Sequence, residues 1–215
     1  MTTKTTDLTK QLGGLVLLAL GFYLMGEVNL HIGMLQNLTL LVFSIAAAAL
    51  IFGKSAFEWF KKPQGKYIKI GLACLVLNAV WGMVGGIAIQ LIFGTAGHHG
   101  NAAFGDYSLL AFVPFMLMGE ELFSISILET LRTKWKLSPL VASLITAAVF
   151  GLIHFSTYFG GDALRTVTQI LLVQGVARLI FNYAYLKTGS IWTSWAVHVV
   201  FDLVPLFLLP LILNK

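Results

Sequence analysis

Charged residues are scarce in this sequence. Only 11% of its 215 residues are Asp, Glu, Lys or Arg, against about 25% in a typical soluble domain. Hydrophobic residues make up 58%, and the mean hydropathy is +0.86. A chain of this size with so few polar side chains cannot cover a soluble surface. The composition therefore excludes a soluble globular protein and predicts an all-α, polytopic membrane protein.

Cysteine is almost absent. Cys74 stands alone in an apolar run, which excludes a disulfide framework and argues against a thiolate zinc site. No polar linker is long enough to separate two domains, so we predict one integral membrane domain over residues 1–215. No stretch alternates aromatic and basic residues, so we expect the lipid bilayer, and no nucleic acid, among its partners.

Apolar runs bounded by charge, Gly or Pro predict seven to eight membrane spans. The runs cover residues 12–30, 35–52, 67–93, 107–131, 139–158, 164–186 and 191–204. The apolar tail after Pro205 is either a kinked continuation of the seventh span or a short eighth one. The first run has no small-residue cleavage site, so we expect it to be retained as a helix.

Basic residues alternate between the predicted loops. They precede the first span, lie between the second and third, and follow the fourth and sixth. By the positive-inside rule the N-terminus is cytoplasmic, and we expect a multi-pass protein of the cell membrane. Lys215 would also be cytoplasmic if the tail crossed the membrane, which favours eight spans over seven.

Two adjacent glutamates, Glu120 and Glu121, lie near the middle of the fourth span. A charged side chain there costs about 2.5 kcal/mol or more on insertion scales, so the pair needs a local reason. His154 in the fifth span, and His198 with Asp202 in the seventh, fall at a similar depth if helices rise about 1.5 Å per residue. We predict that these five residues form an intramembrane catalytic site.

Spacing restricts what each residue of this set can do. Glu120 and Glu121 project about 100° apart on a helix, so one should act at the site while a partner holds the other. His198 and Asp202 are i,i+4 and share a helix face. Asp202 could therefore orient the His198 ring, bind a metal beside it or hold a proton.

A carboxylate with two imidazoles suits the activation of water. Glu120 could act as a general base, while a neutral imidazole shares the proton or stabilises an oxyanion. Phe150, at i,i+4 from His154, would support that ring. Glu120, His154, His198 and Asp202 could instead be ligands of Zn²⁺. The HExxH pattern is absent, so a zincin geometry is excluded, but a zinc cofactor is left open.

Four short motifs resemble one known family. They are GEELF at residues 119–123, FGLIH at 150–154, TGSIW at 188–192 and HVVFD at 198–202. In this order they resemble the CAAX-protease and bacteriocin-processing (CPBP, or Abi) family of intramembrane proteases, which includes the type II CAAX endopeptidases. We expect the protease core at residues 107–205.

The resemblance implies an eight-helix bundle with a central cavity and hydrolysis of a peptide bond near a C-terminus or leader junction. By position, Glu120 resembles the water-activating base and His154 its partner. His198 and Asp202 resemble the groups that stabilise the oxyanion or complete the site. The family is described as metallo-endopeptidases from its motif, yet a glutamate mechanism fits these residues equally well.

One departure from the family pattern concerns a missing arginine. The first motif is normally EExxxR, but Ile125 stands at the Arg position, so Glu121 needs another cation. We predict that Arg178, deep in the sixth span, replaces it by pairing with Glu121 or Glu120. Polar residues at i,i+4 spacing on either side of Arg178 are Gln174 and Asn182.

A second departure is Asp202, which stands where the family often has Asn. An ionised Asp would repel an oxyanion, so it must be protonated, bind a metal or act through His198.

These features predict an intramembrane endopeptidase that acts on a membrane-associated peptide or protein. The loss of the arginine at Ile125 also motivates an alternative, a catalytically weak relative that binds a peptide and provides bacteriocin self-immunity. A proton- or ion-coupled transporter should show inverted-repeat symmetry between its halves, and the sequence has none.

Overall fold

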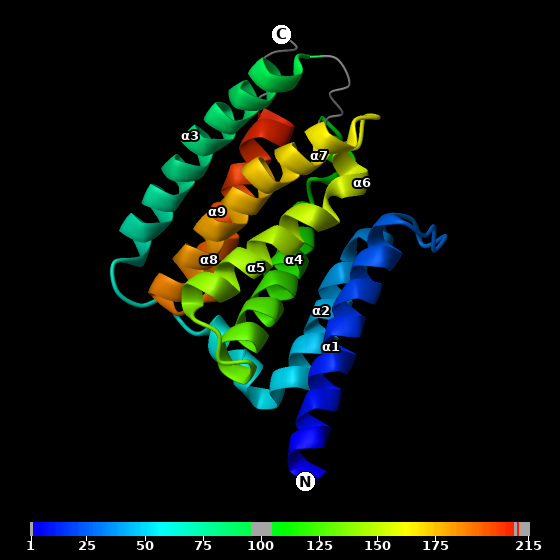
Figure 1. Ribbon diagram of the computed structural model, residues 1–215, viewed down its shortest axis with the longest axis vertical. Helices are drawn as coiled ribbons and strands as arrows, with labels where there is room; N and C mark the ends of the chain where they lie inside the picture. The colour runs from blue at the N-terminus through cyan, green and yellow to red at the C-terminus, as the bar shows by residue number, and fades with distance from the viewer. Residues whose placement is uncertain (1, 96–104, 209, 211–215) are drawn as a thin grey trace.

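The computed structural model describes residues 2–95, 105–208 and 210, and these residues form helices and turns without any strand (Figure 1). The α-helices are α1 (Thr2–Gly26), α2 (Thr39–Phe52), α3 (Tyr67–Phe93), α4 (Val113–Glu129), α5 (Pro139–Ile153), α6 (Phe155–Tyr158), α7 (Ala163–Gln169), α8 (Val176–Thr188) and α9 (Ile191–Leu203). The 3-10 segments are η1 (Gly33–Leu38), η2 (Gly53–Phe60) and η3 (Tyr107–Leu109). The π-helical segments are η4 (Thr130–Lys134), η5 (Ile170–Gly175) and η6 (Val204–Leu208). The all-α prediction is confirmed for this part of the chain.

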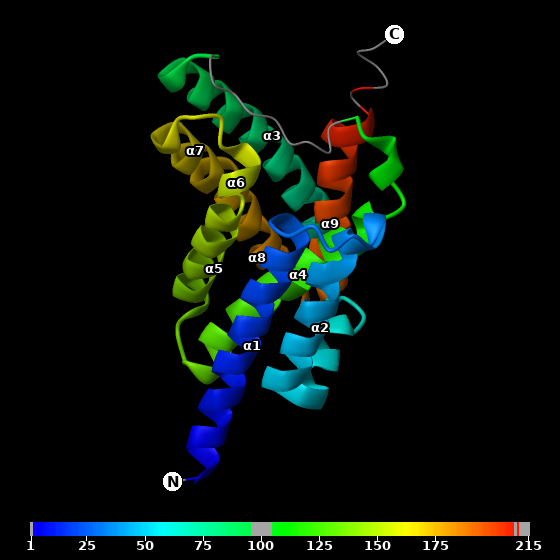
Figure 2. The ribbon, with the colours of Figure 1, turned by 90° about the vertical axis from the view of Figure 1, so that its right-hand side faces the viewer.

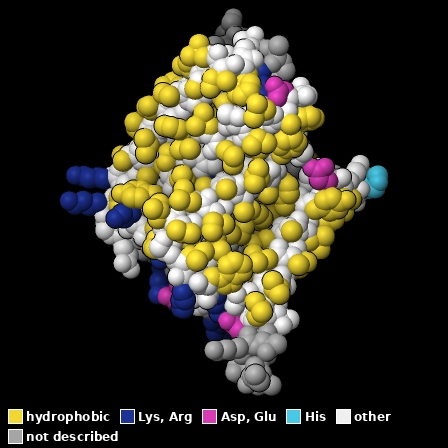
Figure 3. All heavy atoms as spheres, viewed as in Figure 1, with side chains coloured by type: hydrophobic (Ala, Val, Ile, Leu, Met, Phe, Trp, Pro, Cys, Tyr) yellow, Lys and Arg dark blue, Asp and Glu magenta, His cyan; other side chains and the backbone are white. Residues whose placement is uncertain are grey.

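Five helical segments of the described residues are long and apolar enough to cross a membrane. They cover residues 7–26, 33–60, 67–93, 163–188 and 191–208. Large apolar side chains point outward along them, with Leu91 81% and Ile92 66% exposed. Figure 3 shows hydrophobic side chains over most of one face, with Lys and Arg at its edges. The protein is a multi-pass helical membrane protein, while the count of seven to eight spans, the cell membrane and the orientation stay predictions.

Two of the remaining predicted spans are shorter than expected. Helix α4 begins at Val113 with Pro114 in its first turn, where a missing N–H costs nothing, and it has 17 residues. Helix α5 has 15 residues and ends at Ile153, so the predicted fifth span breaks at His154 before the short α6.

The chain continues past Pro205 as a π-helical turn, η6, which accommodates a residue that cannot donate a backbone hydrogen bond. Most of the tail considered as an eighth span, residues 209 and 211–215, lies outside the described residues.

Helix α4 lies at the centre of the bundle (Figures 1 and 2). The α1–α2 pair packs on one side of it through α2, whereas α9 packs on it directly and joins it to α3 and α8. Helix α5 packs against η5 and α8. The largest apolar cluster is built around Leu122, Ile125 and Leu128 of α4. Helix α4, which carries the two glutamates, is therefore surrounded by other helices of the bundle.

Candidate active site

The two glutamates lie in the middle of α4 and differ in burial. Gly119, just before them, allows a close approach to α2, because a Cβ at this position would lie 2.8 Å from the Leu41 nitrogen. The closest approach of α4 to α2 at this level thus lies directly beside the pair. Glu121 is 0% exposed, whereas the Glu120 side chain is 17% exposed and lines a cavity. One carboxylate is thus enclosed and the other is accessible.

Glu121 is held by Arg178 of α8. Arg178 Nη1 donates to Oε1 at 2.6 Å and Nη2 to Oε2 at 3.1 Å, which makes a bidentate ion pair. Arg178 Nε donates to Asn182 Oδ1 at 3.0 Å, and Asn182 Nδ2 donates to the Ser143 carbonyl at 3.5 Å. We call these four residues the sealed side of the site. The contact between Arg178 and Glu121 that the sequence suggested is present.

Ile125 is part of the apolar core, where it is 0% exposed and packs with Leu122 and Leu128. The guanidinium that pairs with the α4 carboxylate comes instead from α8. Its central carbon lies 5.6 Å from the Phe150 ring centroid and 5.2 Å from that of Phe181. These rings cover the ion pair and add a cation–π contact.

His198 of α9 lies between the sealed side and the cavity. Its Nδ1 is 3.0 Å from Glu121 Oε1, and its ring stacks on Phe181 with centroids 4.3 Å apart. A carboxylate in an ion pair only accepts hydrogen bonds, so Nδ1–H donates and Nε2 is left toward the cavity. Asp202, for which the sequence left three roles open, lies 3.7 Å from Nε2, and the hydrogen bond to Nδ1 is made by Glu121.

Glu120, His154 and Asp202 form what we call the open side of the site. With His198 they line a cavity of about 250 Å³. Glu120 Oε2 is 3.8 Å and Asp202 Oδ2 is 3.7 Å from His198 Nε2. Both distances exceed a direct hydrogen bond and suit a bridging water molecule.

His154 stands at the break between α5 and α6. Its Nδ1 lies 2.7 Å from the Phe150 carbonyl and donates to it, which leaves Nε2 for the cavity. The Phe150 ring supports the imidazole at 4.7 Å between centroids, as the i,i+4 spacing suggested. Gly151 allows α5 to reach η5, because a Cβ there would lie 2.7 Å from the Ile170 carbonyl oxygen.

The sequence did not single out two tryptophans that join the helices around the site. Trp195 Nε1 of α9 donates to the Pro114 carbonyl of α4 at 2.8 Å, and Trp81 Nε1 of α3 donates to the Leu172 carbonyl of η5 at 2.7 Å. The available signal was that an indole N–H within an apolar span must find an acceptor. Gln174, predicted only as a neighbour of Arg178, lines the cavity. Its Oε1 has no hydrogen-bond partner in the described part of the chain.

The zinc ligand set that the sequence allowed is not gathered around one point. Among the described residues, no group of three or more His, Cys, Asp or Glu side chains could hold a metal ion. The donors present do not fit a metal centre in this arrangement, so we derive no step through one.

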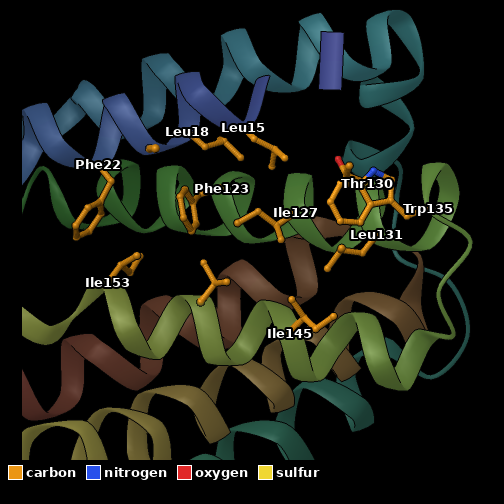
Figure 4. A pocket seen from close by; sticks show the side chains of 12 residues that line it. Leu15, Leu18, Phe22, Phe123, Ile127, Thr130, Leu131, Trp135, Ile145 and Ile153 are labelled. Carbon is orange, nitrogen blue, oxygen red and sulfur yellow. The ribbon is translucent and has the colours of Figure 1, made fainter. Parts of the chain in front are cut away.

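A second cavity, of about 530 Å³, lies on the other flank of Glu120 and His154, which line both cavities. It meets a groove of about 410 Å³ between α1, α4 and α5, with which it shares Phe22 and Ile153. In Figure 4 the groove is lined by Leu15, Leu18 and Phe22 of α1, Phe123, Ile127 and Leu131 further along the chain, and Ile145 and Ile153 of α5. This α1 groove is apolar and leads, through the second cavity, to Glu120.

Comparison with known families gives one match. Residues 105–204 match the family described as Type II CAAX prenyl endopeptidase Rce1-like. The match spans the segment from the turn before α4 through α9, which contains all the residues of the sealed and open sides. Searches of curated proteins and of solved structures give no match.

Proposed function

We propose that this chain, which matches the type II CAAX prenyl endopeptidase family through residues 105–204, hydrolyses a peptide bond of a lipid-modified, membrane-associated peptide or protein. One observation carries the proposal. Of two adjacent carboxylates, Glu121 is locked by Arg178 and Glu120 reaches the cavity, 3.8 Å from His198 Nε2. A base and its imidazole partner therefore face the same space.

In the proposed reaction, Glu120 takes a proton from a water molecule held between its carboxylate and the imidazoles. The oxygen of that water bonds to the carbonyl carbon of the scissile peptide. Glu120 then delivers the proton to the leaving nitrogen as the C–N bond breaks, so the products are a carboxylic acid and an amine. Glu120 therefore acts first as the base and then as the acid, and it ends the cycle in its starting protonation state.

The two histidines have different parts in this scheme. His154 Nε2, free because Nδ1 is bonded to the Phe150 carbonyl, accepts a hydrogen bond from the attacking water. His198, protonated on both nitrogens, donates Nδ1–H to Glu121 and Nε2–H to the developing oxyanion. Glu121 and Arg178 are positioning residues, because they reach the reacting atoms only through His198.

The α1 groove supports a lipid-modified substrate. Its lining is apolar, and from Phe123 to Leu131 it follows α4 and η4 for about 12 Å at 1.5 Å per residue. We assign the isoprenyl chain of the substrate to this groove and the peptide to the cavities on either side of Glu120. The Gln174 amide is then available to bind a peptide backbone group.

The test is cleavage of a prenylated peptide by purified protein, with the same peptide lacking the prenyl group as a comparison. Glu120→Ala, His154→Ala and His198→Ala should each abolish cleavage while the protein still inserts. Glu58→Gln, an exposed acidic position on η2, is the matched control and should keep activity. Normal cleavage by all three variants would make this function wrong. Peptidomics of cells carrying wild type or Glu120→Ala would then identify the physiological substrate.

The self-immunity alternative makes a different prediction. A peptide-binding factor would keep its protective effect in a Glu120→Gln variant, because that substitution preserves shape and removes only the base. Protection that is lost together with cleavage supports the protease.

A further inference from the structure

A second apolar groove lies on the opposite side of α9 from the active site. It has a volume of about 380 Å³ and runs between α3 and α9. Its lining includes Tyr67, Leu72 and Leu75 of α3 and Thr193, Val197 and Val200 of α9. None of them lines either cavity beside Glu120. This α3–α9 groove is therefore a separate surface feature that the proposed reaction does not use.

The groove continues into a small basic hollow. The hollow has a volume of about 190 Å³, is lined by residues 65–69, and shares Tyr67 and Ile68 with the groove. Lys66 and Lys69 are therefore within its wall, and Lys62 is close in sequence. All three lysines are exposed. Figure 3 shows Lys and Arg side chains at the edge of the face where α3 begins.

Charge in this region is strongly one-sided. Residues 54–69 contain five lysines and one acidic residue, Glu58. Glu58 is already paired with Lys61. Within the described part of the chain, no ion pair involves Lys62, Lys66 or Lys69. The hollow thus offers uncompensated positive charge where an apolar groove ends.

The N-terminus of α3 adds to the positive electrostatic potential of the hollow. Helix α3 has 27 residues, and no side chain caps its first turn at Lys66. The N-terminus of a helix carries partial positive charge and free N–H groups, which favour an anion. Tyr67 and Trp192, both partly exposed, are the residue types that lie at the level of lipid headgroups.

A buried polar group in the groove has no partner of its own. Thr193 is 6% exposed and lines the groove, and its Oγ1 makes no hydrogen bond in the described residues. A buried hydroxyl without a partner is costly, so a ligand that brings an acceptor would stabilise it.

We propose that the groove and the hollow together bind one anionic glycerophospholipid. The acyl chain lies along Leu72, Leu75 and Val200, and an ester oxygen accepts from Thr193. The phosphate lies in the hollow, against Lys66, Lys69 and the start of α3. Basic clusters next to a membrane helix attract anionic lipids in general. The adjoining groove would hold the acyl chain of one such lipid in a defined position. Val197 and Val200 of the groove belong to α9, so the bound lipid would contact the helix that also carries His198.

Native mass spectrometry of the purified full-length protein tests the site. Phosphatidylglycerol and phosphatidylcholine with identical acyl chains are added in turn, and bound lipid is counted. We expect phosphatidylglycerol to be retained in preference to phosphatidylcholine. The triple variant Lys62→Gln, Lys66→Gln, Lys69→Gln should weaken phosphatidylglycerol binding about tenfold or more. Equal retention of the two lipids would overturn the proposal.

A matched control removes the same charge elsewhere. Lys10 and Lys136 are exposed away from the hollow, and their double replacement by Gln, compared with Lys66→Gln, Lys69→Gln, should leave phosphatidylglycerol binding within a factor of about two, since net charge acts weakly at a distance in salt. A loss equal to that of the hollow variant would show attraction by net charge alone and would overturn the site.

The groove is tested separately from the lysines. Ala196 is exposed in the groove, so Ala196→Leu should fill it and reduce phosphatidylglycerol binding without disturbing the core. Ala79→Leu, exposed on α3 outside the groove, is the control and should bind normally. Unchanged binding by Ala196→Leu would show that no acyl chain occupies the groove. Inorganic phosphate should not compete; displacement of the lipid by phosphate would equally count against the site.

Discussion

The two sides of His198 use the same kinds of residue in opposite ways. On the sealed side, Glu121 has two bonds to Arg178 and one to His198, and it is 0% exposed. On the open side, Glu120 and Asp202 stop 3.8 and 3.7 Å from the same ring and face a cavity. A carboxylate whose oxygens are hydrogen-bonded to the protein is held in place. A carboxylate that faces a cavity without such bonds is free to react with a water molecule. Substitutions on the open side should therefore change turnover, and those on the sealed side should change stability as well.

The largest effect is expected from Glu120→Gln. A general base contributes about 10²- to 10⁴-fold to a rate, so kcat for the prenylated peptide should fall by that factor. Stability should stay within about 0.5 kcal/mol, because the side chain is partly exposed and makes no direct hydrogen bond in the structure. Cleavage assays and thermal unfolding in detergent measure the two quantities. A large loss of stability would contradict the division into two sides.

Arg178→Leu should have the largest effect on stability. It leaves the Glu121 carboxylate buried without its partner, which costs about 3–5 kcal/mol of unfolding free energy. The double variant Arg178→Leu, Glu121→Leu removes both charges and should recover most of that stability. Activity should not return, because His198 has lost the group that orients it. If the double variant regained activity, the sealed side would have no positioning role.

Moving the arginine should recover part of the loss. Ile125 lies at i,i+4 from Glu121 on α4, so Arg178→Leu with Ile125→Arg offers a guanidinium from the same helix. We expect this double variant to regain about half of the lost stability and measurable cleavage. Recovery should be incomplete because Ile125 is also a core residue and its replacement disturbs packing. Ile125→Leu with Arg178→Leu is the control without charge. Equal behaviour of the two double variants would show that the position of the cation is not interchangeable.

Filling the α1 groove should change substrate binding more than chemistry. Ala19 is exposed in the groove, and Ala19→Leu should raise KM for the prenylated peptide about tenfold with little change in kcat. Ala46→Leu, exposed on α2 away from the groove, is the control. An unchanged KM would show that the chain of the substrate lies elsewhere.

Asp202→Asn should have the smallest effect. Asp202 is 28% exposed on its side chain and makes no hydrogen bond to His198, so stability should hold within about 0.5 kcal/mol. Asn can still donate to a developing oxyanion, so kcat should change by less than about tenfold. Loss of activity comparable to that of Glu120→Gln would give Asp202 a proton-carrying role that Asn cannot fill.

Much of this molecule followed from the order of its residues. Apolar runs predicted the third helix at both of its ends, Tyr67 and Phe93, because hydrophobic length and breakers act locally. The spacing of Glu120, His154 and His198 predicted a shared site, since helix rise converts sequence position into depth. The break at His154 could not be read in the same way. The break lies three residues after a close contact between Gly151 and η5, which are separated in sequence.

The amino-acid sequence by itself predicted that three carboxylates, two imidazoles and one arginine would share one site within the apolar helices. Only the tertiary structure decided which carboxylate the arginine would hold, that Glu121 rather than Asp202 would bond to His198, and that α1 would complete a groove beside Glu120. The physical reason is that burial and hydrogen bonding belong to the packing of whole helices. Glu120 and Glu121 are the same type of residue, and they differ only because neighbouring helices bury Glu121 and leave Glu120 facing a cavity.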